Sequence, residues 1–164
     1  MSRFHDEVLP PEQKDALRSL APVAVSEGFH LAGGTALAIQ LGHRQSIDFD
    51  WFRRAPIADP LQLAAKLRDV LGAFELVEVA GGTVHGKLGG VRVSFFEYGY
   101  AALRPTLLWA EFGCPLASLS DLACFASLSY FDDADREPMP VMLNGWTWSH
   151  VTTAVANAVR SAVG

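Results

Sequence analysis

The sequence predicts an α+β domain in which a mixed sheet is flanked by helices and followed by a short helical tail. Half of the 164 residues are hydrophobic, which suffices for one substantial core. Alternation of apolar and polar residues recurs between residues 47 and 98, and segments with helical spacing lie around it. We therefore expect a core over residues 1–115 and a helical C-terminal region over residues 116–164.

The N-terminal part predicts two helices around a short strand. A helix is expected over residues 11–27, since two prolines suit its start and Gly28 suits its end. FHLAGG, residues 29–34, predicts a strand that ends in paired glycines. TALAIQL, residues 35–41, predicts an apolar helix that is closed by Gly42.

The middle of the chain predicts one more helix and three strands. Residues 59–72 are amphipathic, with Asp59 as the N-cap and a proline in the first turn. Strands are expected at residues 74–79, 83–88 and 91–98, and glycine pairs between them suit tight hairpins.

From residue 116 the pattern becomes helical. SLSDLACFASLSY, residues 118–130, predicts a helix, and FDDADREPMPVML, residues 131–143, predicts a proline-bearing loop. Residues 146–163 predict the last helix. No internal repeat interrupts this order.

Composition and charge exclude several classes of protein. Thirteen basic residues against eighteen acidic ones give a formal net charge of −5, which argues against a broad basic surface that holds nucleic acid through phosphates alone. No apolar stretch approaches the roughly 18 residues of a membrane span, and no signal segment is visible. We expect a cytoplasmic protein without a membrane partner, in which Cys114 and Cys124 are free thiols.

Two carboxylates in one predicted strand are the first candidates for a functional site. In IDFDWF, residues 47–52, Asp48 and Asp50 alternate with apolar residues, so they project from the face opposite the core. Their Cα atoms should lie roughly 6.5–7 Å apart, and such carboxylates repel unless a cation lies between them. Hard oxygen ligands of this kind suit Mg²⁺ or Mn²⁺.

A glycine-rich turn precedes these acids. Gly33 and Gly34 end a strand and begin a helix, where glycine permits a sharp turn and a close ligand. Thr35 adds a hydroxyl at the helix N-terminus, where free N–H groups favour a phosphate. A phosphate cradle and metal-binding carboxylates in one unit are typical of a two-metal phosphoryl-transfer site.

A third acid is predicted at Glu97. In the strand at residues 91–98, alternation places Glu97 on one face with three apolar residues. If this strand lies beside residues 47–52, we expect Glu97 to join Asp48 and Asp50. Taken singly, each feature also has a structural interpretation: the acids can be a solvent-facing strand edge, and the glycine turn can be an ordinary helix start.

At this point the sequence resembles a family. AGGTALAIQLGHRQSIDFDWF, residues 32–52, is similar to the signature of the AbiEii/AbiGii-type nucleotidyltransferases. These are toxin components of bacterial toxin–antitoxin and abortive-infection systems, with a DNA polymerase β-like fold. SLSYFDDADREPMPVML, residues 127–143, with the Trp-containing helix after it, is similar to the family's C-terminal stretch.

The resemblance implies a role for each motif residue. Gly33 and Gly34 would line a nucleoside triphosphate, with Thr35 near its phosphates, while Asp48 and Asp50 would bind Mg²⁺. His43 and Arg44 would lie at the mouth of the site, with Arg44 as a phosphate contact. Glu97 would be the third acid of the site. A solvated loop is the alternative interpretation for His43 and Arg44.

The chain departs from the family pattern after Asp121. Members usually continue an Asp-Leu-Ala sequence into a helix with a lysine, but Asp121-Leu122-Ala123 runs directly into CFASLSYFDDAD. The chain is therefore interpreted as internally shortened. Apolar residues that the missing helices would cover then need another cover, and we expect a homodimer to provide it; the candidates are Phe125, Leu128, Tyr130 and Phe131.

The function predicted from these features is Mg²⁺-dependent transfer of a nucleoside monophosphate from an NTP to an acceptor hydroxyl. The acceptor is expected to be RNA or protein, and the resemblance adds a cognate antitoxin as a partner. The alternative is a catalytically degenerate relative that binds nucleotide or another protein. A metal phosphohydrolase is disfavoured, because the five histidines show no ligand spacing.

Overall fold

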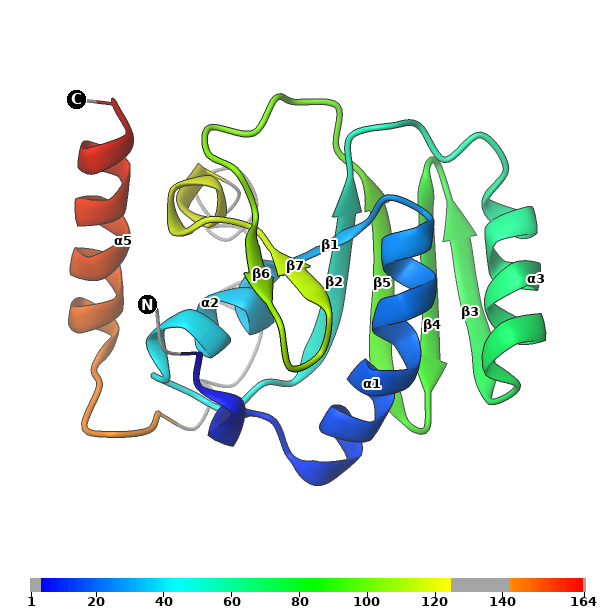
Figure 1. Cartoon of the computed structure of the whole chain (residues 1–164), viewed down its shortest axis with the longest axis horizontal. Coiled ribbons are helices and arrows are strands. Elements are labelled where there is room, and N and C mark those ends of the chain that lie inside the picture. The colour runs from blue at the N-terminus through cyan, green and yellow to red at the C-terminus, as the bar shows by residue number, and fades with distance from the viewer. Residues whose placement is uncertain (1–3, 125–141, 164) are drawn as a thin grey trace.

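A computed structural model describes residues 4–124 and 142–163 (Figure 1). Its centre is a seven-stranded mixed sheet in the order β3-β4-β5-β2-β1-β7-β6. The strands are β1 His30–Ala32, β2 Asp48–Arg53, β3 Phe74–Ala80, β4 Thr83–Leu88, β5 Val91–Glu97, β6 Leu107–Trp109 and β7 Cys114–Leu116. The helices are the 3-10 turn η1 Asp6–Val8, α1 Pro11–Ser26, α2 Gly33–Leu41, α3 Pro60–Leu71 and α5 Trp148–Val163. Residues 119–124 are also helical.

The three central strands define the topology. β2 runs antiparallel to β1 and parallel to β5, and the hairpins β3–β4 and β4–β5 extend the sheet on one side. A parallel pair needs a crossover connection, and α3 lies in the segment that joins β2 to the β3–β5 meander. The predicted adjacency of residues 29–33, 47–52 and 91–98 is confirmed.

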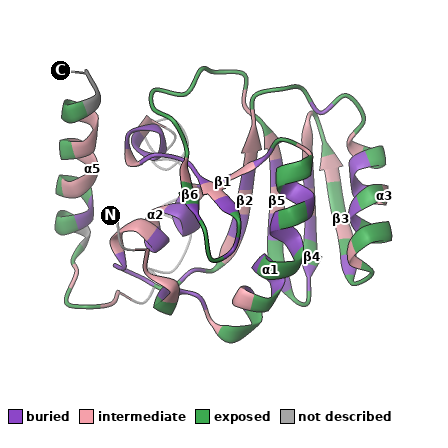
Figure 2. Ribbon diagram, in the orientation of Figure 1, coloured by how far each residue is buried: buried purple, intermediate pink, exposed green. Residues whose placement is uncertain are grey.

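One face of the sheet carries the core. α1 and α3 pack against it and against each other, and the side chains of Phe49, Trp51 and Phe95 have no exposed surface. Exposed residues of α1 and α3 lie on the outer sides of these helices (Figure 2). On the opposite face, β2, β5 and β4 carry half-buried and exposed side chains, Asp48 and Asp50 among them. That face is where a ligand can reach the strands.

Local sequence signals account for most element boundaries. The Asp59 side chain accepts a hydrogen bond from the Gln62 N–H at 3.0 Å and so caps α3. Gly42 follows α2 in the left-handed conformation, with φ +64°. Each predicted helix and strand up to residue 98 is present within a few residues of its expected bounds.

Three features of the fold differ from the predictions or lie beyond their test. The strands β6 and β7 were not predicted; β7 lies between β6 and β1 and pairs with β1 through Leu31 and Leu116. Ile47 was expected inside a strand on the core face, yet it precedes β2 and is 43% exposed. The four apolar residues proposed for dimer contact, Phe125, Leu128, Tyr130 and Phe131, and most of the predicted loop lie outside the described residues.

The division at residue 115 stays a prediction. Cys114 and Cys124 are free thiols, as expected. Burial raises the pKa of the Cys114 thiol to about 12. Within residues 4–124 and 142–163, none of the helices has the length and apolar character needed to cross a bilayer.

Candidate active site

Asp48 and Asp50 project from β2 on the face away from the core. Their neighbours Phe49 and Trp51 are fully buried on the other face, so the strand cannot rotate without exposing two aromatic rings. Both aspartates are half-buried. The structure therefore confirms that the two carboxylates share one face of a strand that the core holds in place.

Gly33 brings the N-terminus of α2 against Asp50. Ala32, the residue before it, pairs with Asp50 across the β1–β2 ladder. Gly33 has φ +62°, and a β-carbon at this position would lie 2.4 Å from Asp50 Oδ2. Only glycine satisfies both conditions. Among the described residues, no side chain caps α2. The first N–H groups of a helix lack intrahelical partners, so unpaired backbone donors of α2 lie beside the Asp50 carboxylate.

Thr35 does not occupy the position that was expected for it. Its side chain is fully buried, and its hydroxyl donates a short hydrogen bond to the Asp48 carbonyl oxygen. Ser46 Oγ lies 2.8 Å from the same hydroxyl. The expectation that Thr35 stands near the phosphates is therefore corrected: its hydroxyl ties α2 to the start of β2, and so fixes the backbone that carries Asp48.

Glu97 does not join the two aspartates, and the predicted convergence is wrong. The parallel register pairs Glu97 with Arg53. Arg53 is an odd number of residues away from Asp48 and Asp50 along β2, so Arg53 and Glu97 lie on the opposite face of the sheet. The Glu97 carboxylate instead accepts a hydrogen bond from the Ile57 N–H at 2.9 Å, and its side chain covers Gly82.

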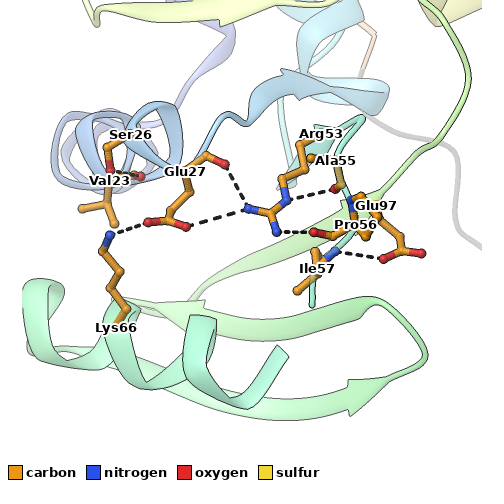
Figure 3. A network of polar contacts seen from close by, with 9 residues as sticks. All are labelled: Val23, Ser26, Glu27, Arg53, Ala55, Pro56, Ile57, Lys66 and Glu97. Carbon is orange, nitrogen blue, oxygen red and sulfur yellow. Dashed lines mark hydrogen bonds and ion pairs between the residues drawn. The ribbon is translucent and has the colours of Figure 1, made fainter. Parts of the chain in front are cut away.

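Figure 3 shows this carboxylate beside a separate polar network around Arg53. Arg53 donates to the carbonyl oxygens of Glu27 and Pro56, at 3.0 and 2.6 Å, and Lys66 also pairs with the Glu27 carboxylate. The network joins α1, α3 and the end of β2. Alternation along β5 already indicated that Glu97 lies on the core face. It shares this face with Val91, Val93 and Phe95, which are core residues.

Three residues that the sequence reasoning missed lie beside the aspartates. The register places Arg92 next to Asp48 and Ser94 next to Asp50, and an Arg92 guanidinium nitrogen lies 3.5 Å from Asp48 Oδ2. His85 on β4 pairs with Ser94, and its Nδ1 lies 2.9 Å from Ser94 Oγ. Alternation along β5 could have placed Arg92 and Ser94, since both oppose the apolar core residues of that strand.

His43 and Arg44 are buried, not exposed at a mouth or on a solvated loop. His43 has no exposed surface, and Arg44 is 7% exposed. The Arg44 side chain donates to the Gln45 carbonyl oxygen at 3.0 Å. Within the described part of the chain, neither ring nitrogen of His43 has a hydrogen-bond partner. Burial, helped by the Arg44 charge, lowers the pKa of His43 to about 4, so this ring is a neutral packing residue at pH 7.

The donor set fits one divalent cation better than two. Across residues 4–124 and 142–163, no group of three or more His, Cys, Asp or Glu side chains is arranged to hold a metal. Mg²⁺ needs only one or two protein carboxylates and takes its remaining ligands from water and phosphate. Asp48 and Asp50 therefore match one such ion bound together with a phosphate-bearing ligand.

Comparisons with known proteins give a family match and a curated relative. Residues 15–106 match the model of the family described as nucleotidyl transferase AbiEii toxin, type IV TA system. An uncharacterised protein, aq_aa25, of Aquifex aeolicus (strain VF5) is 33% identical over 123 residues. That match covers 74% of this chain but only 59% of the length of the Aquifex protein.

Solved structures share the fold. The crystal structure of ANT(2″)-Ia in complex with adenylyl-2″-tobramycin superposes with a TM-score of 0.54 at 17% identity, covering 93% of this chain and 90% of that one. A solution structure of the antibiotic-resistance factor ANT(2″)-Ia gives the same score and identity, with 92% and 85% covered. The mixed sheet with flanking helices is thus a nucleotidyltransferase fold, as the sequence predicted.

Proposed function

The chain belongs to the AbiEii nucleotidyltransferase toxin family, and from this premise we propose that it binds a nucleoside triphosphate and transfers the nucleotidyl group to an acceptor hydroxyl. The family match includes the Gly33 turn, both aspartates and the strand β5. Reactions of this class displace pyrophosphate from the α-phosphorus of the triphosphate, so the site must hold an anionic chain and neutralise its charge.

One contact carries the proposal: Asp50 packs against Gly33 at the start of α2. Backbone N–H groups at a helix start bind phosphate oxygens, and the adjacent carboxylates would otherwise repel the same phosphates. Gly33 and Gly34 hold the anionic chain, and Asp48 and Asp50 hold the Mg²⁺ or Mn²⁺ that accompanies it. The bound cation would supply charge neutralisation at the phosphates.

The acceptor and the partners extend this proposal. We propose RNA or protein as the acceptor and a cognate antitoxin as the regulator, because toxin components of this family act within such systems. A second copy of the chain and a cytoplasmic location remain proposals of the same kind. The net charge of −5 favours recognition of a local feature of the acceptor over binding along a nucleic-acid backbone.

One observation favours a second candidate function, a nucleotide-binding module without turnover. Among the described residues, the positions of β5 that face Asp48 and Asp50 are Arg92, Ser94 and Phe96, and none of these is acidic. A general base for the acceptor hydroxyl must then come from another side chain or from the acceptor complex. Binding without transfer would identify this alternative.

Titration calorimetry with ATP, GTP, CTP and UTP, with and without Mg²⁺, tests the proposal. We expect the wild-type chain to bind at least one of them only with the cation, and the Asp48→Ala/Asp50→Ala variant to lose this binding. Asp69→Ala is the matched control, because Asp69 is an exposed acid on α3. Equal binding by the wild type and the double variant would contradict the proposal.

A further inference from the structure

We propose that Ser94 is itself an acceptor of the nucleotidyl group, with His85 as the base that takes its proton. This inference rests on the proposed function, because it requires a nucleoside triphosphate at Asp50. Ser94 on β5 is the site of the covalent modification, and His85 on β4 is the residue that assists it.

The position of Ser94 comes from the sheet. β2 lies between β1 and β5, and Asp50 is paired with Ala32 on one side and with Ser94 on the other. Adjacent strands are about 4.8 Å apart, so the start of α2 and the Ser94 side chain flank Asp50 from opposite sides. Asp50, Ser94 and His85 also share the face of the sheet that α1 and α3 leave uncovered.

This arrangement matches the requirement of an in-line displacement. The attacking oxygen and the leaving oxygen must lie on opposite sides of the α-phosphorus. If the triphosphate chain lies on the backbone donors of Gly33 and Gly34, its leaving end is on the β1 side of Asp50. Among the described residues of β5, Ser94 carries the hydroxyl that lies on the other side of Asp50.

His85 supplies the second requirement, a proton acceptor. Its Nδ1 lies 2.9 Å from Ser94 Oγ, within the range in which a serine hydroxyl donates to an imidazole. The ring is held edge-on against Phe96, with centroids 5.7 Å apart. Both side chains are half-buried, so a ligand can reach them while bulk water has limited access.

The step exchanges one phosphorus–oxygen bond for another. Ser94 Oγ forms a bond to the α-phosphorus, the bond from that phosphorus to the oxygen bridging to the β-phosphate breaks, and pyrophosphate leaves. The serine proton passes to His85 Nδ1. The product is a phosphodiester in which the transferred α-phosphate joins Ser94 Oγ to the nucleoside, and no oxidant or further reactant is needed.

The full-length chain is incubated with Mg²⁺ and each of ATP, GTP, CTP and UTP, and intact mass and peptide mapping are recorded. We expect one nucleoside monophosphate, mapped to Ser94, on the wild type and none on Ser94→Ala. His85→Gln should slow the modification about 100-fold, the range of a lost general base. Ser19→Ala is the matched control, since Ser19 is exposed on α1, and it should be modified like the wild type.

Calorimetry on the same proteins separates the outcomes. Ser94→Ala should bind the triphosphate with Mg²⁺ as the wild type does, which shows that it is folded. A wild type that binds the triphosphate without gaining an adduct, or an adduct that persists in Ser94→Ala, overturns the inference but leaves the proposed function. A wild type that binds none of the four overturns both.

Discussion

The carboxylate of Asp50 lies against the Cα of Gly33, with no room between them for a side chain. A β-carbon on Gly33 would lie 2.4 Å from Asp50 Oδ2 and 3.0 Å from Asp50 Cβ. The contact joins the turn before α2 to the second acid of β2, two features that are 17 positions apart in the sequence (50 minus 33). Substitutions at Gly33 and Asp50 test this contact directly.

Gly33→Ala should weaken nucleotide binding. The substitution places an L-residue at φ +62°, which costs about 1–2 kcal/mol of folding free energy, and it also displaces the Asp50 carboxylate. We expect at least a tenfold loss of affinity for the Mg²⁺-bound triphosphate, equivalent to about 1.4 kcal/mol, measured by calorimetry.

Gly72→Ala is the matched control for this variant. Gly72 has φ +63°, and a β-carbon added there would meet nothing within 4 Å, so its replacement adds backbone strain without a clash. It should lower the free energy of unfolding by a similar amount and leave binding intact. If both variants bind equally well, the contact between Gly33 and Asp50 is not part of the site.

Thr35→Val should reduce stability and weaken binding only as a consequence. Valine keeps the shape but removes the hydroxyl that bonds to the Asp48 carbonyl oxygen and to Ser46, and a lost buried hydrogen bond costs about 1–3 kcal/mol. Urea unfolding measures the loss, with the exposed Thr152→Val as control. A variant of normal stability that loses nucleotide binding would restore Thr35 as a direct phosphate contact.

The His43 ring should make the protein less stable in acid. Its pKa is lowered from 6.5 to about 4, so the unfolded chain binds a proton at a pH where the folded chain does not. The contribution of the neutral ring is complete above pH 6.5 and is lost as the pH falls toward 4. The full change is about 3 kcal/mol by linkage.

His43→Leu should remove this dependence, because leucine does not titrate. Among the described residues, the ring nitrogens make no hydrogen bond that the variant would lose. Denaturant unfolding between pH 4 and 7 measures it. The control is His150→Gln, at an exposed position on α5, which should keep the acid sensitivity of the wild type. A His43→Leu profile as steep as that of the wild type would show that another group is responsible.

Glu97→Gln should leave nucleotide binding unchanged, whereas Asp50→Asn should weaken it at least about tenfold. Glu97 is paired with Arg53 on the opposite face, and its replacement affects the hydrogen bond from the Ile57 N–H. Both variants keep the shape of the side chain and remove one charge, so calorimetry compares the two positions directly. Equal losses would return Glu97 to the site.

Much of the site was determined by local sequence. Alternation in IDFDWF separates Asp48 and Asp50 from Phe49 and Trp51, because successive side chains of a strand point to opposite faces. The paired glycines predict the sharp turn before α2, and Gly33 has the positive φ that glycine permits. The resemblance to nucleotidyltransferases depends on these same residues, which is why the fold class was also predicted correctly.

The tertiary structure decided which side chains stand beside the aspartates. A period of two assigns residues to a face but leaves the pairing of separate strands open, and the parallel register of β2 with β5 brings Arg92 and Ser94 to the acids. Burial of His43 and the inward hydroxyl of Thr35 depend on how α2 packs, which their polar character does not reveal. Local periodicity determined the faces of the strands, whereas long-range packing determined their neighbours, since contacts between distant segments form only when the core is assembled.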